Sequence, residues 1–118
     1  MPASAVEMLR SRSDFVALQQ DARSRVDRIL VVRYRRNDLE RHRFGISTGK
    51  RLGNAVIRNR TRRRIREALR RLDQRPGPGF DFLVVARQAS ADATYQQITD
   101  SLRRTIGQIG AGEGTRQA

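Results

Sequence analysis

The chain has 118 residues, which is enough for one domain with a single modest core. Its 25 lysines and arginines against 12 aspartates and glutamates give a formal net charge of +13, and nucleic acid is the partner that such an excess of positive charge favours. The absence of cysteine excludes disulfides, cysteine-ligated zinc and thiol catalysis, and the absence of tryptophan disfavours binding to a membrane surface.

The N-terminal segment predicts a flexible tail and then a short helix. Residues 1–8 contain little that a core would bury, so we expect them to be flexible. Ser13 and Asp14 are candidate helix caps, and they precede an amphipathic turn that contains Phe15. These features predict a helix over residues 14–21.

Two strands are predicted next. Residues 28–35 are rich in isoleucine, leucine, valine and tyrosine, which are residues typical of strands. A polar turn at residues 37–40 leads into a second predicted strand at residues 42–48. We expect these two strands to pair with each other in antiparallel fashion.

Eight arginines occupy the fourteen positions from Arg58 to Arg71, and a turn marked by Gly49 and Gly53 precedes them. The pattern predicts a helix over residues 54–73. Its core side gathers Ile57, Thr61, Ile65, Ala68, Leu69 and Leu72. The opposite side carries Asn59, Arg63, Arg66 and Arg70, with Arg60, Arg64 and Arg71 on one flank and Arg58 and Arg62 on the other.

This helix would be positively charged over most of its exposed surface. Like charges four residues apart disfavour an isolated helix by about 0.2–0.5 kcal/mol per pair, a cost that a bound polyanion would remove. The competing interpretation is an arginine-rich face that is merely solvated. The density of arginine favours RNA or DNA.

The C-terminal part predicts a loop, a buried strand and a final helix. Residues 75–79, with two prolines and two glycines, break the preceding helix. Residues 80–87 have a continuous apolar middle, which indicates a strand that is buried on both faces or lies in the centre of the sheet. A helix is expected at residues 91–109, followed by a flexible tail at residues 110–118. The element order is typical of an α/β two-layer sandwich in which helices pack on a central sheet.

The sequence shows no set of residues typical of a protein nuclease. His42 is the only histidine and is expected to be a polar surface residue. The acidic residues are scattered singly, as in Asp38, Glu40, Asp81, Asp92 and Asp100. We therefore expect no catalytic residue and no metal site in this chain. No apolar run has the length of a membrane span and the start of the chain lacks a signal-peptide pattern, so a cytoplasmic location is expected.

The string from Phe44 to Glu67, FGISTGKRLGNAVIRNRTRRRIRE, closely resembles the signature of the protein subunit of bacterial ribonuclease P. The resemblance extends to Leu9–Phe15 and to Asp81–Arg87, so it covers roughly residues 8–108. The domain boundaries expected from it are residues 9–109.

The resemblance implies an α-β-β-β-α-β-α sandwich of α+β type, similar to a ribosomal-protein fold, with a mixed sheet and a left-handed βαβ crossover around the arginine helix. It also implies a short extra strand near residues 22–26. Members of this family bind the large catalytic RNA and contact the 5′ leader of precursor tRNA in a cleft beside the first helix. They promote endonucleolytic removal of that leader, while the RNA performs the hydrolysis with bound Mg²⁺.

Carried over to this chain, the resemblance implies two sets of RNA-binding residues and one protein per RNA. The catalytic RNA would be bound by Lys50, Arg51, Asn54, Arg58, Asn59, Arg60, Arg62, Arg63, Arg64 and Arg66. The leader would be contacted by Phe15, Arg12, Arg33 and Tyr34.

Several positions keep a second interpretation or depart from the family pattern. Phe15 could equally anchor the first helix in the core. Gln19 and Arg33 stand where aromatic residues are common in the family, and Gly49 stands where serine is usual. A competing function is a structural RNA-binding protein, such as a ribosomal component or an RNA chaperone, for which charge and fold would be similar.

Overall fold

The computed structural model describes residues 7–72 and 79–116 and contains the predicted order of elements. The helices and strands are α1 (Arg12–Gln20), β1 (Arg23–Val26), β2 (Leu30–Arg36), β3 (Arg43–Thr48), α2 (Ala55–Arg70), β4 (Phe80–Ala86) and α3 (Tyr95–Arg116). Two short 3-10 helices, η2 (Lys50–Leu52) and η3 (Gln88–Asp92), lie before α2 and α3. The predicted α-β-β-β-α-β-α order is confirmed, and so is the extra strand near residues 22–26.

The strands form one mixed sheet in the order β1-β2-β4-β3. β4 pairs with β2 in antiparallel fashion and with β3 in parallel fashion, and β1 pairs antiparallel with β2. The predicted direct pairing of the second and third strands is therefore wrong, because β4 lies between them. β4 is the strand with the continuous apolar run, and only a central position buries both of its faces.

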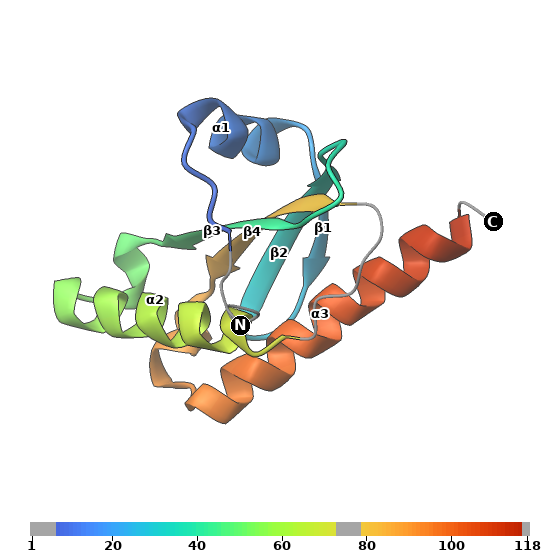
Figure 1. The fold of residues 1–118 in the computed structure, drawn as a ribbon. Helices are drawn as coiled ribbons and strands as arrows, with labels where there is room; N and C mark the ends of the chain where they lie inside the picture. The colour runs from blue at the N-terminus through green and yellow to red at the C-terminus, as the bar shows by residue number, and fades with distance from the viewer. Residues whose placement is uncertain (1–6, 73–78, 117–118) are drawn as a thin grey trace.

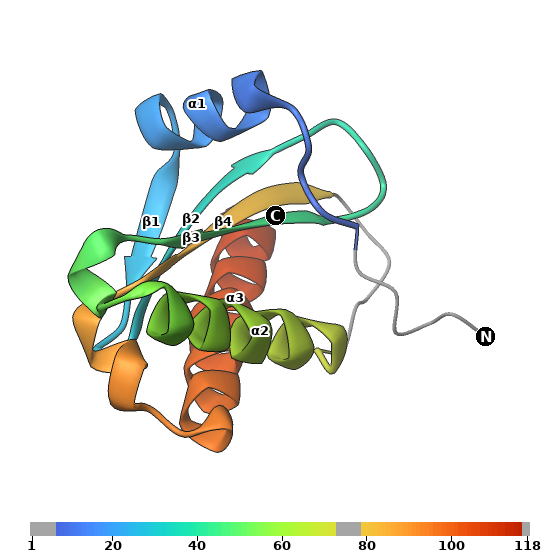
Figure 2. The same ribbon diagram turned by 90° about the vertical axis from the view of Figure 1, so that its left-hand side faces the viewer.

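Helices cover both faces of this sheet (Figures 1 and 2). α2 and α3 lie together on one face, and α1 lies on the other. α2 connects β3 to its parallel neighbour β4. The left-handed sense of this crossover stays an expectation from the resemblance.

The main core lies between the sheet and the pair α2 and α3. The sheet contributes Leu30, Val32, Phe82 and Val84, and the helices contribute Ile65, Leu69, Ile98 and Leu102. All eight are almost fully buried, and each such side chain stabilises the fold by about 1.5–3 kcal/mol through burial alone. A second, smaller core of Leu9, Leu18 and Leu83 holds α1 on the opposite face, which we call the α1 face.

The helix starts are set by side-chain caps. The Oγ of Ser11 accepts a hydrogen bond from the backbone N–H of Ser13 at 3.1 Å, so α1 begins at Arg12, earlier than predicted, and its cap is Ser11. Asn54 caps α2 by accepting from the N–H of Ile57 at 3.0 Å. At α3, Thr94 and Gln97 cap each other's backbone reciprocally.

The chain ends differ from the predicted tails. Residues 1–6 and residues 75–78 of the predicted loop lie outside the described residues. Met8 forms a parallel bridge with Phe44, and Glu7 forms an ion pair with Arg41, so residues 7 and 8 are held against β3. The final helix ends at Arg116 rather than at residue 109. The glycines after residue 109 lower helix stability by about 1 kcal/mol each but do not end a helix that already exists.

Candidate nucleic-acid interface

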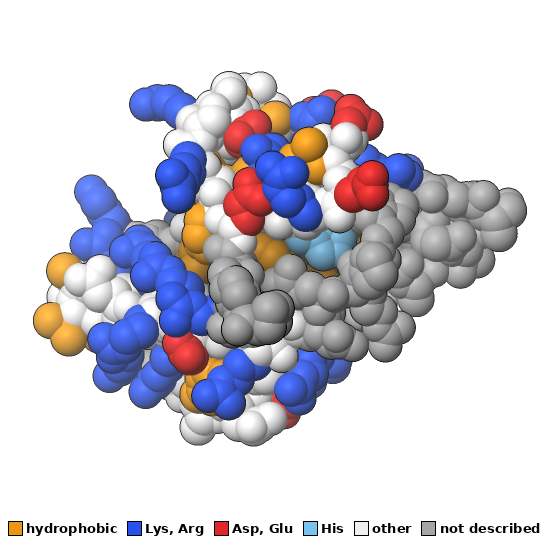
Figure 3. Space-filling model, in the orientation of Figure 1, with side chains coloured by type: hydrophobic (Ala, Val, Ile, Leu, Met, Phe, Trp, Pro, Cys, Tyr) orange, Lys and Arg blue, Asp and Glu red, His pale blue; other side chains and the backbone are white. Residues whose placement is uncertain are grey.

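α2 separates its apolar and charged residues as the sequence predicted. Thr61, Ile65, Ala68 and Leu69 are buried, with Ile57 and Leu72 packed against the core. The residues predicted to point outward are all exposed: Asn59, Arg63, Arg66 and Arg70. We call these four the arginine ridge. Figure 3 shows blue side chains gathered along α2 with little red among them.

Arg60 and Arg64, on one flank of α2, contact the segment after β4. A guanidinium nitrogen of Arg60 donates to the carbonyl of Ala91 at 3.2 Å, and one of Arg64 donates to the carbonyl of Ala93 at 3.0 Å. Both arginines are only partly exposed. They therefore have a structural role in holding the η3 segment beside α2.

Arg58 and Arg62 line the other flank, toward β3, and both are partly buried. Arg62 donates to the hydroxyl of Thr48 at the end of β3 and to the side chain of Asn59. This bond ties the helix to the strand that precedes it. The predicted set of RNA-binding arginines thus divides into an exposed ridge and flanks that also brace the fold.

The turn before α2 presents the cations Lys50 and Arg51 on η2, and both are exposed. Gly53 has a backbone φ of 140°, and a Cβ at this position would lie 2.8 Å from the Cδ1 of Ile57. Glycine is required here for both reasons. Asn54, predicted to bind RNA, uses its side-chain oxygen for the helix cap.

Phe15, predicted to contact the leader, lies on the α1 face. Its ring packs with the small core of Leu9, Leu18 and Leu83, and it remains partly exposed. A Cβ on Gly45 would come within 2.6 Å of this ring, so the glycine in β3 is needed for Phe15 to lie against the sheet. The core-anchor interpretation of Phe15 is therefore supported. Arg12, at the start of α1, is exposed.

Arg33 also lies on the α1 face, where it caps the end of α1. Its Nε donates to the carbonyl of Leu18 at 2.6 Å and its Nη2 to the carbonyl of Gln19 at 3.0 Å. The last carbonyls of a helix lack intrahelical partners and favour a cation. Arg33 thus fastens α1 to β2.

The prediction that Tyr34 contacts the leader is not supported by its position. Tyr34 belongs to the main core, on the face opposite α1, and is 3% exposed. Its ring meets that of Phe80 edge to face, with centroids 6.1 Å apart. Successive strand residues point to opposite faces, so Arg33 and Tyr34 could not both lie on the α1 face.

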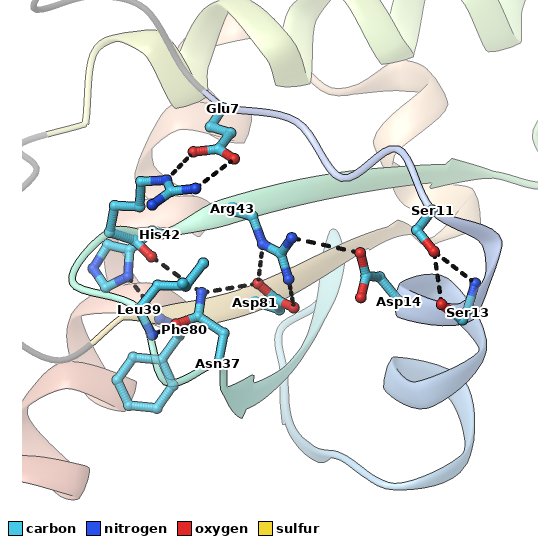
Figure 4. Close-up of polar contacts among 11 residues, drawn as sticks. Glu7, Ser11, Ser13, Asp14, Asn37, Leu39, His42, Arg43, Phe80 and Asp81 are labelled. Atoms are coloured by element: carbon cyan, nitrogen blue, oxygen red, sulfur yellow. Dashed lines mark hydrogen bonds and ion pairs between the residues drawn. The ribbon is translucent and has the colours of Figure 1, made fainter.

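An ion pair on the α1 face between the partly exposed Arg43 and the buried Asp81 was not predicted. Arg43 donates twice to the carboxylate of Asp81, at 2.8 and 2.7 Å, and lies 3.5 Å from the carboxylate of Asp14 in α1. Asn37 donates a further bond to Asp81 at 2.9 Å. Figure 4 shows Arg43 lying between the two carboxylates. The hydrogen bonds from Arg43 to Asp81 raise the pKa of Arg43. Through its two carboxylate partners Arg43 links β3 to β4 and to α1.

His42 is partly exposed, as a surface residue would be, but its ring also belongs to the aromatic packing. Its ring lies 5.2 Å from that of Phe82, and its Nδ1 accepts the backbone N–H of Phe80 at 3.0 Å. The neutral ring is required, because a protonated Nδ1 cannot accept this bond. Burial lowers the pKa of His42 below its ordinary value of 6.5.

Acidification from pH 7.5 to 5 is expected to lower the melting temperature through His42. In the unfolded chain this histidine takes up a proton near pH 6.5, whereas the folded chain resists it, so the unfolded state binds more protons below that pH and stability falls. Thermal melts of the wild type and of His42→Gln between pH 7.5 and 5 measure this effect.

The variant should be less stable at pH 7.5 and should show a flatter dependence on pH. The Arg41 side chain lowers the pKa of Glu7 below 4.5, so that carboxylate titrates outside this range. Equal pH dependence in the two proteins would contradict the role assigned to His42.

Within residues 7–72 and 79–116, no three histidine, aspartate or glutamate side chains gather in a way that could hold a metal ion. No helix in the described part of the chain is long and apolar enough to cross a membrane. The candidate functional feature is the basic surface built by α2 and the η2 turn, together with a second surface beside α1 that carries Arg12 and Phe15.

Known proteins are similar to this chain over most of its length. The family model described as Ribonuclease P matches residues 4–110. The ribonuclease P protein component of Clostridioides difficile strain 630 is 36% identical over 99 residues, which are 83% of this chain and 87% of that protein.

Two solved structures share the fold. The Staphylococcus aureus RNase P protein superposes with a TM-score of 0.73 at 32% identity and covers 87% of this chain and 94% of its own. The RNase P protein from Thermotoga maritima gives 0.71 at 27% identity and covers 83% and 93%.

Proposed function

Because the chain belongs to the ribonuclease P protein family, we propose that α2 docks it onto the catalytic RNA of that enzyme. Family membership implies a ribonucleoprotein that contains the ribonuclease P RNA and acts in tRNA 5′ processing. The observation that supports the docking proposal is the arginine ridge, which is exposed along a helix whose other side is buried. Guanidinium groups on such a ridge pair with phosphates in bidentate fashion.

We propose that the arginine ridge and the exposed η2 cations Lys50 and Arg51 make the main phosphate contacts. Arg58, Arg60, Arg62 and Arg64 would contribute from the flanks. Arg60, Arg62 and Arg64 use part of their hydrogen-bonding capacity inside the protein. Asn54 would contribute chiefly by fixing the start of α2. RNA binding would then relieve the repulsion among the arginines of this helix.

The second part of the proposal concerns the precursor tRNA. The partly exposed ring of Phe15 and the exposed Arg12 lie at α1, where the 5′ leader would pass. Arg33 would act mainly by holding α1 in place, since its guanidinium is bonded to the carbonyls of Leu18 and Gln19. Tyr34 is removed from this set because it is buried in the other core.

In this proposal the RNA, and not the protein, carries out the hydrolysis. The described residues offer no cluster of metal ligands, and Asp81, a buried carboxylate, is bound to Arg43. Mg²⁺ would be held mainly by the RNA, with one protein per RNA in the cytoplasm. The protein would supply positive charge and position the substrate.

A cleavage assay tests the proposal. At limiting Mg²⁺, adding the protein to its cognate catalytic RNA should increase the rate of leader removal from precursor tRNA, and the protein alone should cleave nothing. The RNA that copurifies with the protein provides a second measurement. A single catalytic RNA is expected, whereas ribosomal RNA together with no rate enhancement would favour the structural RNA-binding alternative.

A further inference from the structure

Val56 is a large apolar residue that is mostly exposed at the start of α2. It is 72% exposed, and among the described residues only one other large hydrophobic side chain, Val26 at 66%, is comparably exposed. Val56 is the second residue of α2, and its neighbour Ala55 is exposed as well. The start of the basic helix therefore carries a small apolar tip.

The start of α2 is built so that Val56 cannot turn inward. Ile57 occupies the inward position and packs against the main core. The Asn54 cap fixes the first turn, and Gly53, with its positive φ, lies directly against the side chain of Ile57. Val56 is therefore exposed because the capped start of α2 places this position on the side of the helix that faces away from the core.

Val56 lies in line with the arginine ridge. Residues 56, 59, 63, 66 and 70 follow each other at intervals of three and four, so they share one side of the helix. The exposed cations Lys50 and Arg51 precede it on η2. In Figure 3, orange atoms at the N-terminal end of α2 border the blue side chains of the helix. A polyanion that follows the ridge would cover this tip.

We propose that Val56 makes an apolar contact with the ribose or base surface of the catalytic RNA, beside the phosphates held by the ridge. This inference rests on the proposed function. Valine has no donor for a phosphate, so its favourable contact must be with carbon atoms of the nucleotide, and its contribution comes from apolar area removed from water. Val56 would then add affinity that does not depend on counterion release.

The test compares Val56→Thr and Val56→Ala with the wild type in binding to the cognate catalytic RNA over a range of salt concentrations. Thr keeps the β-branched shape, and Ala favours the helix, so circular dichroism should show an intact fold in both. The matched control is Val26→Thr, which makes the same change at the exposed valine of β1.

Each Val56 variant is expected to bind about 3- to 10-fold more weakly than the wild type, from the loss of buried apolar area. The slope of log K against log salt should be unchanged, because no phosphate contact is lost. Val26→Thr should bind within about twofold of the wild type, since its change removes no contact with RNA.

Two results would overturn the inference about Val56 alone: wild-type affinity in both Val56 variants, or an equal loss in Val26→Thr. A wild-type protein that fails to bind the catalytic RNA at all would overturn the proposed function together with this inference.

Discussion

Replacing Arg63 and Arg66 together by glutamine is expected to weaken binding to the catalytic RNA by about 20-fold near 0.15 M salt. Both side chains are exposed on the ridge, so the change leaves the core of α2 intact. Each phosphate contact releases condensed counterions, and losing two should reduce the slope of log K against log salt by about 1.4–1.8. Titration of labelled RNA at several salt concentrations measures both quantities.

The matched control replaces Arg28 and Arg103, which are also exposed but lie outside α2, by glutamine. This variant has the same net charge as the ridge variant. If binding follows the position of the charges, the control should lose less than about threefold, because only long-range attraction is reduced. Equal losses in the two variants would mean that total charge, and not the ridge, determines RNA affinity.

Arg43→Met is expected to destabilise the fold by about 3–5 kcal/mol, because it leaves a buried carboxylate without its cation. Asp81 is 5% exposed and receives two hydrogen bonds from Arg43. For a domain of this size the melting temperature should fall by roughly 10–20 °C. Calorimetry or thermal melts followed by circular dichroism measure the loss.

Two further variants separate the buried pair from ordinary surface charge. Arg41→Met makes the same substitution two residues before Arg43 and removes the exposed ion pair with Glu7. It should change the melting temperature little. Arg43→Met combined with Asp81→Leu should recover at least half of the lost stability, since the unpaired charge is gone. If Arg43→Met alone were as stable as the wild type, the Arg43–Asp81 pair would not be what holds β3 to β4.

The elements with a strong hydrophobic period could be predicted from the sequence, together with the side that each would bury. In α2, the buried residues Thr61, Ile65 and Leu69 and the exposed residues Arg63 and Arg66 follow from helical spacing alone. The apolar run of β4 likewise predicted a strand buried on both faces. The exposed basic side of α2 could therefore be predicted without coordinates.

The roles of residues joined by long-range contacts could not be predicted from the sequence. Arg43 and Asp81 face each other only because β3 and β4 pair in a particular parallel register. Arg33 caps α1 because β2 passes beneath the end of that helix. The pKa of His42 is lowered because its ring is partly buried beside three phenylalanines from β3 and β4.

Apart from the short strand β1, which only the resemblance implied, the order of elements, the basic helix and its buried side were determined by the sequence itself, because periodicity, caps and glycine positions act over a few neighbouring residues. Strand order, the face to which each strand side chain points, and the partners of Arg33, Arg43 and Tyr34 were decided only by tertiary structure. Alternation along a strand separates two faces but does not say which helix covers which, and that choice depends on how the whole chain buries its apolar area.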